Sequence, residues 1–195
     1  MVKTFSCDPP RGSVTAQPWP DERRMQIPSI TLAIETGADY WEAEALYDLC
    51  FSPGRSALSS YRLREDVSPI ADLCWTARDP DAVLAGVIRC WPCYVGETPV
   101  VLLGPVAVHP TRQGEGIAGR LIYRVTQVAR KAGWSRILLV GDLPYYSRFG
   151  FQQLTGVIMP PPTNPERVLG LSLASDSWAG IHGPVRKADD CILPR

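Results

Sequence analysis

The spacing of apolar positions predicts a strand followed by a helix from about residue 29. "SITLAIET" (29–36) alternates apolar and polar positions and is rich in β-branched residues, which favours a strand. From Tyr40 the apolar positions recur every three to four residues, which predicts a helix that ends at Pro53-Gly54. Asp39, with Glu42 three residues later, has the capping-box pattern of a helix start. The polar, basic segment 55–66 fits either a short helix or a loop.

Three strand-like segments follow, and the joints between them are too short for anything but hairpins. They cover residues 72–79, 82–95 and 99–109. Hairpin connections make neighbouring strands antiparallel. Gly104-Pro105 lies inside the third segment. Because proline donates no hydrogen bond to a ladder, we expect a bulge or broken pairing there, or else an edge strand.

The second half of the chain changes to an amphipathic helix and further strands. Over 116–133 an apolar stripe repeats with helical period before Gly133, at Ile117, Leu121, Val125, Val128 and Ala132. We expect a buried strand over 135–142, a short helical turn in "LPYYSRFGF" (143–151) and a last strand over 166–174. The chain divides into a proline-rich arm (1–28), one domain (29–175) and a tail (176–195).

The charges balance, with 20 Lys plus Arg and 20 Asp plus Glu in 195 residues. A net charge of zero gives no general attraction to nucleic acid or to an anionic membrane, so we expect neither as a partner. No apolar run reaches the roughly 18 residues of a membrane span, and the first residues lack the apolar stretch of a signal peptide. We therefore expect a cytoplasmic protein, and a homodimer stays open.

The six scattered cysteines fit reduced thiols better than a disulfide framework. Cys90 and Cys93 have the CxxC spacing of a redox site or half a zinc site. The pair, however, ends a strand instead of opening a helix, and the chain has only two histidines. We interpret both cysteines as thiols in or beside a strand, and we expect no metal site.

The segment "HPTRQGEGIAGR" (109–120) is the strongest functional signal. Gly114-x-Gly116-x-x-Gly119 has the spacing of a dinucleotide-binding site, and Asp142 lies where the ribose-binding acid of such a unit falls. Three observations count against that interpretation. Residues 110–113 separate the strand from the glycines, the unit follows an antiparallel meander, and no further strand–helix–strand unit comes after it.

A phosphate is a suitable ligand for this loop whichever molecule carries it. Glycines leave backbone N–H groups accessible, and the helix N-terminus adds N–H donors without partners and a partial positive charge. Arg112, together with Arg120 or Arg124, would add charge-assisted hydrogen bonds. The alternative is a tight loop whose glycines serve close packing only.

Two motifs carry a resemblance to a known family. "VAVHPTRQGEGIAGRLI" (106–122) resembles the acetyl-CoA loop of the GNAT N-acetyltransferase superfamily, whose signature Gln/Arg-x-x-Gly-x-Gly/Ala matches Gln113-x-x-Gly116-x-Ala118. "YYSRFGF" is similar to a second landmark, a Tyr four residues before a Gly-Phe pair, here Tyr146 and Gly150-Phe151. With "LLGPVAVHP" it most resembles a bacterial branch. The resemblance covers about two thirds of the chain. It implies an α/β (α+β), GNAT-like fold with a central, mostly antiparallel mixed sheet, splayed strands and flanking helices.

The resemblance also implies an enzyme that moves an acetyl group from acetyl-CoA to a primary amine. Pantetheine would lie beside the strand that ends at Val108, and the glycine loop would hold the pyrophosphate. Tyr146 would protonate the leaving thiolate, a task that suits a phenol with a pKa of about 10, while Tyr145 would be packed. A backbone N–H near Val108 would polarise the thioester carbonyl. The implied cofactor-binding residues are Val106, Val108, Arg112, Gln113, Gly114, Gly116, Ile117, Ala118 and Gly119.

The general base and the acceptor stay open. Residues 99–108 contain no ionisable side chain, although many family members place a Glu or His there. Water, Glu35 or Glu42 would then serve, and an amine that is already neutral needs no base. His109 is better explained as structural.

The acceptor side offers Arg55, Tyr61, Arg62 and Arg64. These residues suggest an acidic acceptor, although a solvated basic face more often explains such charges. A non-catalytic module that binds acyl-CoA or an acyl carrier is the alternative to a transferase, and a nucleotide-binding oxidoreductase is less favoured.

Overall fold

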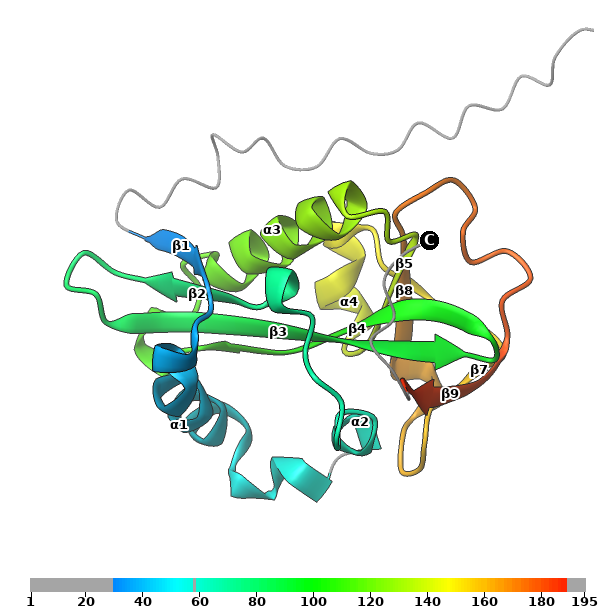
Figure 1. Cartoon of the computed structure of the whole chain (residues 1–195), viewed down its shortest axis with the longest axis horizontal. Coiled ribbons are helices and arrows are strands. Elements are labelled where there is room, and N and C mark those ends of the chain that lie inside the picture. Colours follow the sequence, from blue (N-terminus) through cyan, green and yellow to red (C-terminus); the bar gives the residue numbers. More distant parts are fainter. Residues whose placement is uncertain (1–29, 58, 189–195) are drawn as a thin grey trace, which may run out of the picture.

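The computed structural model describes residues 30–57 and 59–188. Their strands form a mixed sheet (Figure 1). Its main path follows the order β1-β2-β3-β4-β5-β8-β6, and β9 pairs with both β3 and β7. Among these strands only β4–β5 and β7–β9 pair in parallel. The predicted arm, 1–28, lies outside the described residues. The strands are β1 (Thr31–Ile34), β2 (Trp75–Arg78), β3 (Leu84–Val95), β4 (Thr98–Val108), β5 (Arg136–Val140), β6 (Gln152–Gln153), β7 (Val157–Ile158), β8 (Val168–Ser172) and β9 (Gly183–Lys187).

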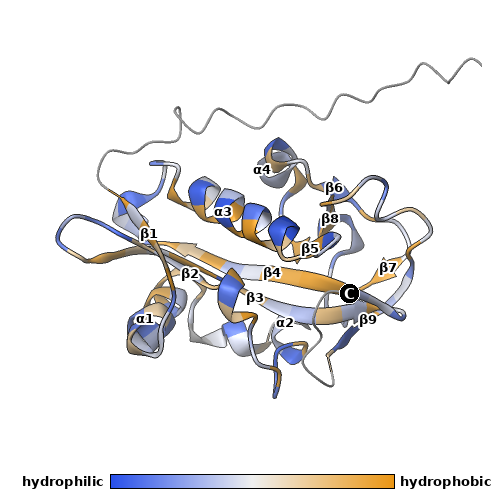
Figure 2. Cartoon of the chain, turned by 45° about the horizontal axis from the view of Figure 1, so that its top comes forward, coloured by the Kyte–Doolittle hydropathy of each residue, from blue (hydrophilic) through white to orange (hydrophobic). Residues whose placement is uncertain are grey.

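Helices cover both faces of the sheet. They are α1 (Tyr40–Phe51), α2 (Ser59–Arg62), α3 (Ile117–Lys131) and α4 (Leu143–Tyr146). α3 and α4 lie over one face, and α1 and α2 lie over the other (Figure 1). α3 turns its apolar side to the sheet and its polar side outward (Figure 2), as its sequence period predicts. Ala132 of the predicted stripe is exposed, because the helix already ends at Lys131.

The long strand β3 is buried along nearly its whole length. Because α3 packs on one face and α1 on the other, its residues are almost continuously apolar instead of alternating. Cys90 and Cys93 are both fully buried in this strand. Burial raises the pKa of both thiols, which makes them unreactive. This confirms that the CxxC spacing belongs to a strand, not to a redox site.

The start of α1 differs from the prediction. Asp39 makes no capping hydrogen bond to α1, and Glu42 forms an ion pair with Arg78 instead. The capping box lies one step earlier, where the Asp39 carboxylate accepts hydrogen bonds of 2.7 Å from the Thr36 N–H and hydroxyl. It caps a short 3-10 helix, Gly37–Asp39, that leads directly into α1.

A β-bulge interrupts β4, as Gly104-Pro105 predicts. Val106 pairs with Ile88, and Leu103 pairs with Cys90. Gly104 and Pro105 therefore both lie opposite the single residue Arg89. β4 pairs with β5 only at Val101–Ile137 and Leu102–Leu138. Beyond those pairs the two parallel strands diverge, which confirms the predicted splay.

The strand predicted as the last, found as β8, is followed by another. β9 pairs antiparallel with β3, from Cys93–Lys187 to Val95–Val185, and parallel with β7. The prediction missed it because "GPVRK" contains a proline and two cations, and its partner strands lie far away in the sequence.

Candidate functional site

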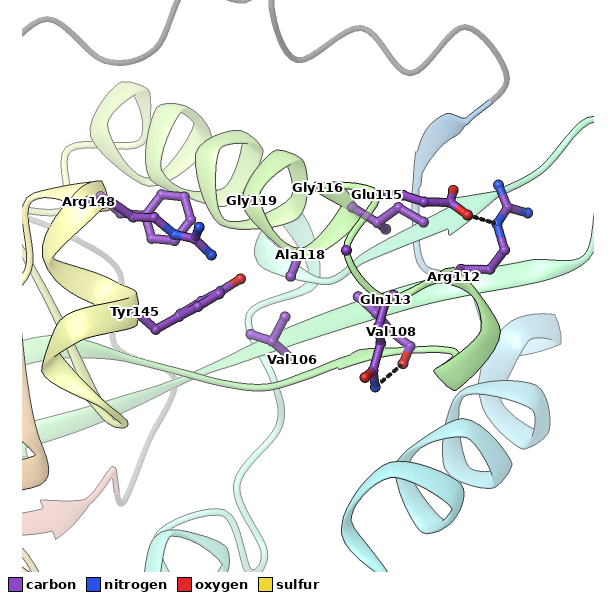
Figure 3. A pocket seen from close by; sticks show the side chains of 13 residues that line it. Val106, Val108, Arg112, Gln113, Glu115, Gly116, Ala118, Gly119, Tyr145 and Arg148 are labelled. Carbon is purple, nitrogen blue, oxygen red and sulfur yellow. Dashed lines mark hydrogen bonds and ion pairs between the residues drawn. The ribbon is translucent and has the colours of Figure 1, made fainter.

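A cavity of about 570 Å³ opens between the end of β4, the glycine loop and α4 (Figure 3). All nine residues predicted to bind a cofactor line it, from Val106 on β4 to Gly119 on α3. Four further residues complete the lining: Glu115, Tyr145, Arg148 and Phe149. The structure therefore brings the predicted set together around one space.

The loop glycines are required by backbone conformation and by open space. Gly114 and Gly116 have φ angles of +87° and +80°, which side-chain-bearing residues rarely adopt. A Cβ on either residue would meet no atom within 4 Å. The close-packing explanation is therefore wrong for these two glycines. At Gly119 a Cβ would lie 3.4 Å from the ring of Phe149, which is an ordinary contact distance.

The N-terminus of α3 faces this cavity without a side-chain cap. Gly116 is the N-cap residue, and the first turn carries no acidic side chain. The N–H groups of the first turn have no partner within the helix, and the helix dipole adds a partial positive charge. Ile117, Ala118 and Gly119 bring these groups to the cavity wall. The wall therefore suits a phosphate or pyrophosphate.

The end of β4 presents its backbone to the cavity. The His109 N–H donates to the Ala85 carbonyl at 2.9 Å, which fixes the alternation of hydrogen bonds between β3 and β4. Under that alternation the backbone groups of Val106 and Val108 point away from β3. The Val108 carbonyl accepts a hydrogen bond from Gln113 Nε2 at 3.3 Å, so the glycine loop is tied to the strand end (Figure 3).

Two arginines beside the cavity differ in their freedom to bind an anion. Arg112 is held by Glu115 at 2.8 Å and by Asp79 at 3.3 Å. Arg148, which the sequence analysis did not single out, lines the cavity with its guanidinium 3.9 Å from the ring centroid of Tyr145. Its position inside the "YYSRFGF" motif was the available signal.

The predicted contribution of Arg120 or Arg124 is wrong. Arg120 donates to the Ile30 carbonyl at 3.0 Å, and Arg124 lies over the ring of Trp75. Both side chains therefore lie away from the cavity, because they project from other sides of α3.

A second cavity, of about 280 Å³, adjoins the first at Val106, which lines both. Its wall includes the β4 bulge, the end of β5 and residues from α2 and its surroundings. Tyr146 lines this second cavity, whereas Tyr145 lines the first. Tyr145 packs against the core, as expected, and it also lines a cavity.

Tyr146 is packed between other aromatic rings. Its ring makes edge contacts with Tyr145 and Phe151, at centroid distances of 5.0 Å and 5.8 Å. Burial, with smaller contributions from Tyr145 and Asp142, raises the pKa of Tyr146 to about 12. The hydroxyl therefore keeps its proton at neutral pH and can act as a donor of a hydrogen bond or a proton.

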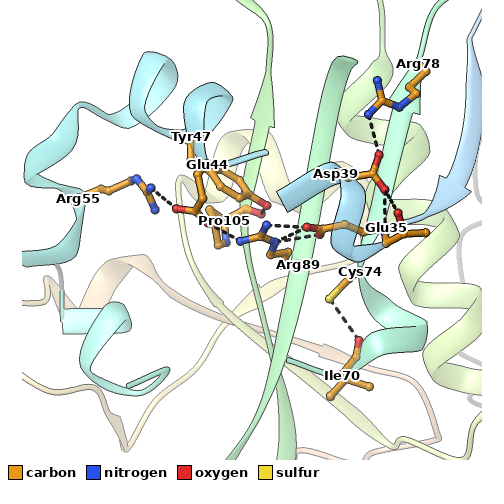
Figure 4. Close-up of polar contacts among 11 residues, drawn as sticks. Glu35, Asp39, Glu44, Tyr47, Arg55, Ile70, Cys74, Arg78, Arg89 and Pro105 are labelled. Atoms are coloured by element: carbon orange, nitrogen blue, oxygen red, sulfur yellow. Dashed lines mark hydrogen bonds and ion pairs between the residues drawn. The ribbon is translucent and has the colours of Figure 1, made fainter. Parts of the chain in front are cut away.

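The two acids considered as bases are engaged in ion pairs (Figure 4). Glu35 receives three hydrogen bonds from Arg89, which is 8% exposed. Glu42 pairs with Arg78. Neither carboxylate lines either cavity. Arg89 also binds Glu44 at 2.5 Å, and Tyr47 donates to the Pro105 carbonyl at 3.4 Å, so this cluster supports the bulge of β4.

The described residues contain no group of three or more His, Cys, Asp or Glu that could hold a metal ion. No helix within 30–57 or 59–188 is long and apolar enough to cross a membrane. His109 contacts Thr111 at 2.8 Å and caps a short 3-10 helix, Pro110–Arg112, which fits its expected structural role.

The site combines three features: the diverging strands β4 and β5, a glycine loop at the N-terminus of α3, and Tyr146 at the cavity between those strands. Together they define a group-transfer site of the acetyltransferase type. The profile of the acetyltransferase (GNAT) family matches residues 40–151. The chain belongs to this family.

Similar proteins agree with that assignment. YjhQ of Escherichia coli K12, named as an uncharacterized N-acetyltransferase, is 27% identical over 135 residues, or 68% of this chain and 75% of YjhQ. YhbS of the same strain, named likewise, is 28% identical over 123 residues, or 62% of this chain and 72% of YhbS.

Solved structures show the same fold. YhbS from Escherichia coli in complex with CoA superposes with a TM-score of 0.72 at 24% identity, covering 86% of this chain and 96% of YhbS. A GNAT family acetyltransferase from Brucella melitensis in complex with acetyl-CoA gives 0.61 at 27% identity, covering 82% and 96%. The predicted family, fold class and acetyltransferase activity are thus confirmed, and the oxidoreductase alternative is not supported.

Proposed function

We propose that this protein transfers an acetyl group from acetyl-CoA to a primary amine and that the two adjoining cavities divide the work. The larger cavity would hold the CoA moiety; the two solved relatives are in complex with CoA and with acetyl-CoA. The smaller cavity would hold the acceptor. One observation carries the proposal: the predicted cofactor residues line a single cavity that meets the cavity of Tyr146 at Val106.

CoA would bind mainly to backbone groups. The pyrophosphate would accept hydrogen bonds from the N–H groups of the glycine loop and the first turn of α3. The pantetheine arm would pair with the backbone of Val106 and Val108, as an added strand pairs with a sheet edge. Arg148 would contribute the positive charge for a phosphate, because Arg112 is already paired with two carboxylates.

The reaction would be a direct attack on the thioester. The amine nitrogen forms a bond to the carbonyl carbon and gives a tetrahedral intermediate, whose oxyanion a backbone N–H at the end of β4 would stabilise. The C–S bond then breaks, and Tyr146 would donate its proton to the departing sulfur. The proton that the amine loses would pass to water, since residues 99–108 offer no base and Glu35 and Glu42 are in ion pairs.

We further infer a cytoplasmic location. Four cysteines among the described residues are free thiols, which fits a reducing compartment.

Thermal unfolding tests the cofactor part of the proposal. Acetyl-CoA at about 100 times its Kd would stabilise the protein by about 2.7 kcal/mol, which raises the Tm of a domain of this size by roughly 5–10 °C. NADPH at the same concentration is the control, because it also carries a pyrophosphate but lacks pantetheine. A shift with NADPH alone would overturn the proposal. Release of free CoA in the presence of an amine then separates a transferase from a non-catalytic acyl-CoA binder.

A further inference from the structure

Arg64 is a partly buried cation that lines the second cavity, and it has no anionic partner among the described residues. Its Nε and Nη1 atoms are buried and have no hydrogen-bond partner among the described residues. Within residues 30–57 and 59–188, Arg64 forms no ion pair with a carboxylate. A hydrogen bond of 2.9 Å from its backbone N–H to the Tyr61 carbonyl fixes the turn that carries it.

The neighbouring arginines show how unusual this is. Arg55 pairs with Glu44 and Asp48, and Arg89 pairs with Glu35 and Glu44. Arg167, the other arginine of the second cavity, pairs with Asp142 at 3.2 Å. Arg64, by contrast, is only partly exposed, and it has no carboxylate partner among the described residues.

Two aromatic rings contact the guanidinium of Arg64, and neither takes up its Nε and Nη1 donors, which are buried without a hydrogen-bond partner. Its Cζ lies 4.5 Å from the ring centroid of Tyr61 and 4.7 Å from that of Trp91. The Tyr61 hydroxyl already accepts a hydrogen bond from Arg55 at 2.5 Å. Stacking uses the faces of a guanidinium, whereas its N–H donors point outward in the plane and match a carboxylate.

Burial lowers the pKa of Arg64 to about 10, yet the side chain is still charged at neutral pH. A buried charge that lacks hydrogen bonds is unfavourable, and binding of an anion would relieve that cost. The second cavity is smaller than the roughly 300–1,000 Å³ of sites for drug-sized ligands. The expected ligand is thus both small and anionic.

We propose that Arg64 binds the carboxylate of the acceptor and that the acceptor is a small amino carboxylate, such as a free amino acid. This inference rests on the proposed function, since it assigns the acceptor of that same site. The carboxylate would lie against the Arg64 edge and the amine toward Tyr146 and Val106, where the thioester would enter. The carboxylate itself takes no part in the bond changes. It holds the amine in place for attack.

Ligand-induced stabilisation tests the inference on the wild-type protein. Thermal unfolding would be measured with saturating CoA and each of the twenty common L-amino acids, and with the corresponding α-amides as matched probes. We expect at least one amino acid to raise the Tm beyond the value with CoA alone, and its amide to need a roughly 30-fold or higher concentration for the same rise. Equal responses to acids and amides, or no response to any acid, would overturn the inference.

Substitutions identify the residue responsible. Arg64→Met should reduce the affinity for the amino acid to that for the amide, while Arg64→Lys should restore it in part. Arg62→Met is the control, because Arg62 is exposed and donates to the Pro161 carbonyl, away from the cavity. If Arg64→Met does not fold, the wild-type comparison of acid with amide still decides the question.

The outcomes also separate this inference from the proposed function. No stabilisation by CoA itself would contradict the proposed function. Stabilisation by CoA with stronger binding of C-terminally amidated tetrapeptides than of any free amino acid would overturn only the role of Arg64 and would indicate a peptide N-terminus as the acceptor.

Discussion

The ring of Tyr146 packs directly on the Cα of Gly141: a Cβ built on Gly141 would lie 2.7 Å from Cδ2 of that ring. No real side chain fits so close. Gly141 follows β5, and its N–H donates to the Arg167 carbonyl at 2.9 Å, so its backbone is held in place. The absence of a side chain at 141 therefore sets the position of the Tyr146 ring in the second cavity.

Gly141→Ala should displace the Tyr146 ring and lower kcat by about 10- to 100-fold, because small shifts of a reacting group are costly. It should destabilise the fold by about 1–3 kcal/mol through overpacking. The Tm shift with CoA should stay as in the wild type. Gly37→Ala is the matched control, since a Cβ there would meet nothing within 4 Å. An unchanged kcat in Gly141→Ala would show that the placement of Tyr146 does not matter.

Tyr146→Phe removes the proton donor and keeps the ring. We expect kcat to fall by about 100-fold or more, with the CoA-induced Tm shift unchanged. Because the pKa of Tyr146 is raised to about 12, its hydroxyl keeps its proton below that pH. Ionisation of this phenol should therefore cause no loss of wild-type activity up to about pH 10. Tyr94→Phe, on β3 beside Arg186, serves as the control. Full activity in Tyr146→Phe would exclude it as the acid.

Gly116→Ala should weaken CoA binding, because a Cβ would project into the space where the pyrophosphate is expected. Gly180→Ala is a close control, since Gly180 also has a positive φ and open space around it but lies outside the cavity. Both variants should lose about 1–2 kcal/mol of stability from the strained backbone. Isothermal titration with CoA should show reduced affinity for Gly116→Ala only. Equal affinities would place the phosphate elsewhere.

Glu44→Gln tests the ion-pair cluster beneath the bulge. Burial alone would raise the pKa of Glu44, but hydrogen bonds from Arg55 and Arg89 lower it below its ordinary value of 4.5. Glu44 therefore contributes stability that is fully present above pH 4.5 and is lost as the pH falls through the lower, folded-state pKa. The variant should lose about 1–3 kcal/mol at pH 7.

Denaturant unfolding from pH 7 to pH 3 checks this pH dependence. The difference between wild type and Glu44→Gln should shrink below pH 4.5. Asp48→Asn, which removes a half-exposed partner of Arg55, should cost less than about 1 kcal/mol. A difference for Glu44→Gln that does not change with pH would mean that its cost comes from packing rather than charge.

Sequence patterns predicted the elements whose signals are local. The hairpins, α3 and the β4 bulge follow from short joints, a helical apolar period and one proline. The roles of Gly114 and Gly116 could also be predicted, because a loop of that kind needs glycine for its backbone conformation. The difference at the start of α1 is local as well: Thr36-x-x-Asp39 is a second capping pattern, and it overlaps the predicted pattern of Asp39 and Glu42.

Features that depend on distant segments were not visible in the sequence. Arg148, on the short 3-10 helix Ser147–Phe149, lines the cavity only because that segment packs against α3. The burial of the Arg64 guanidinium depends on Trp91 from β3, and its lack of an ion pair depends on where the carboxylates lie in the folded chain. Spacing along the chain carries no such information.

The pairing of β9 has a consequence for how the chain folds during its synthesis. β9 completes the edge of β3 that β2 leaves uncovered, so one half of that edge is paired by a segment from the middle of the chain and the other by a segment near its end. Contacts so distant in sequence form slowly. While the ribosome is still adding residues before 183, the exposed half of β3 offers unpaired backbone to other chains. We therefore expect the nascent protein to be prone to aggregation until β9 pairs with β3.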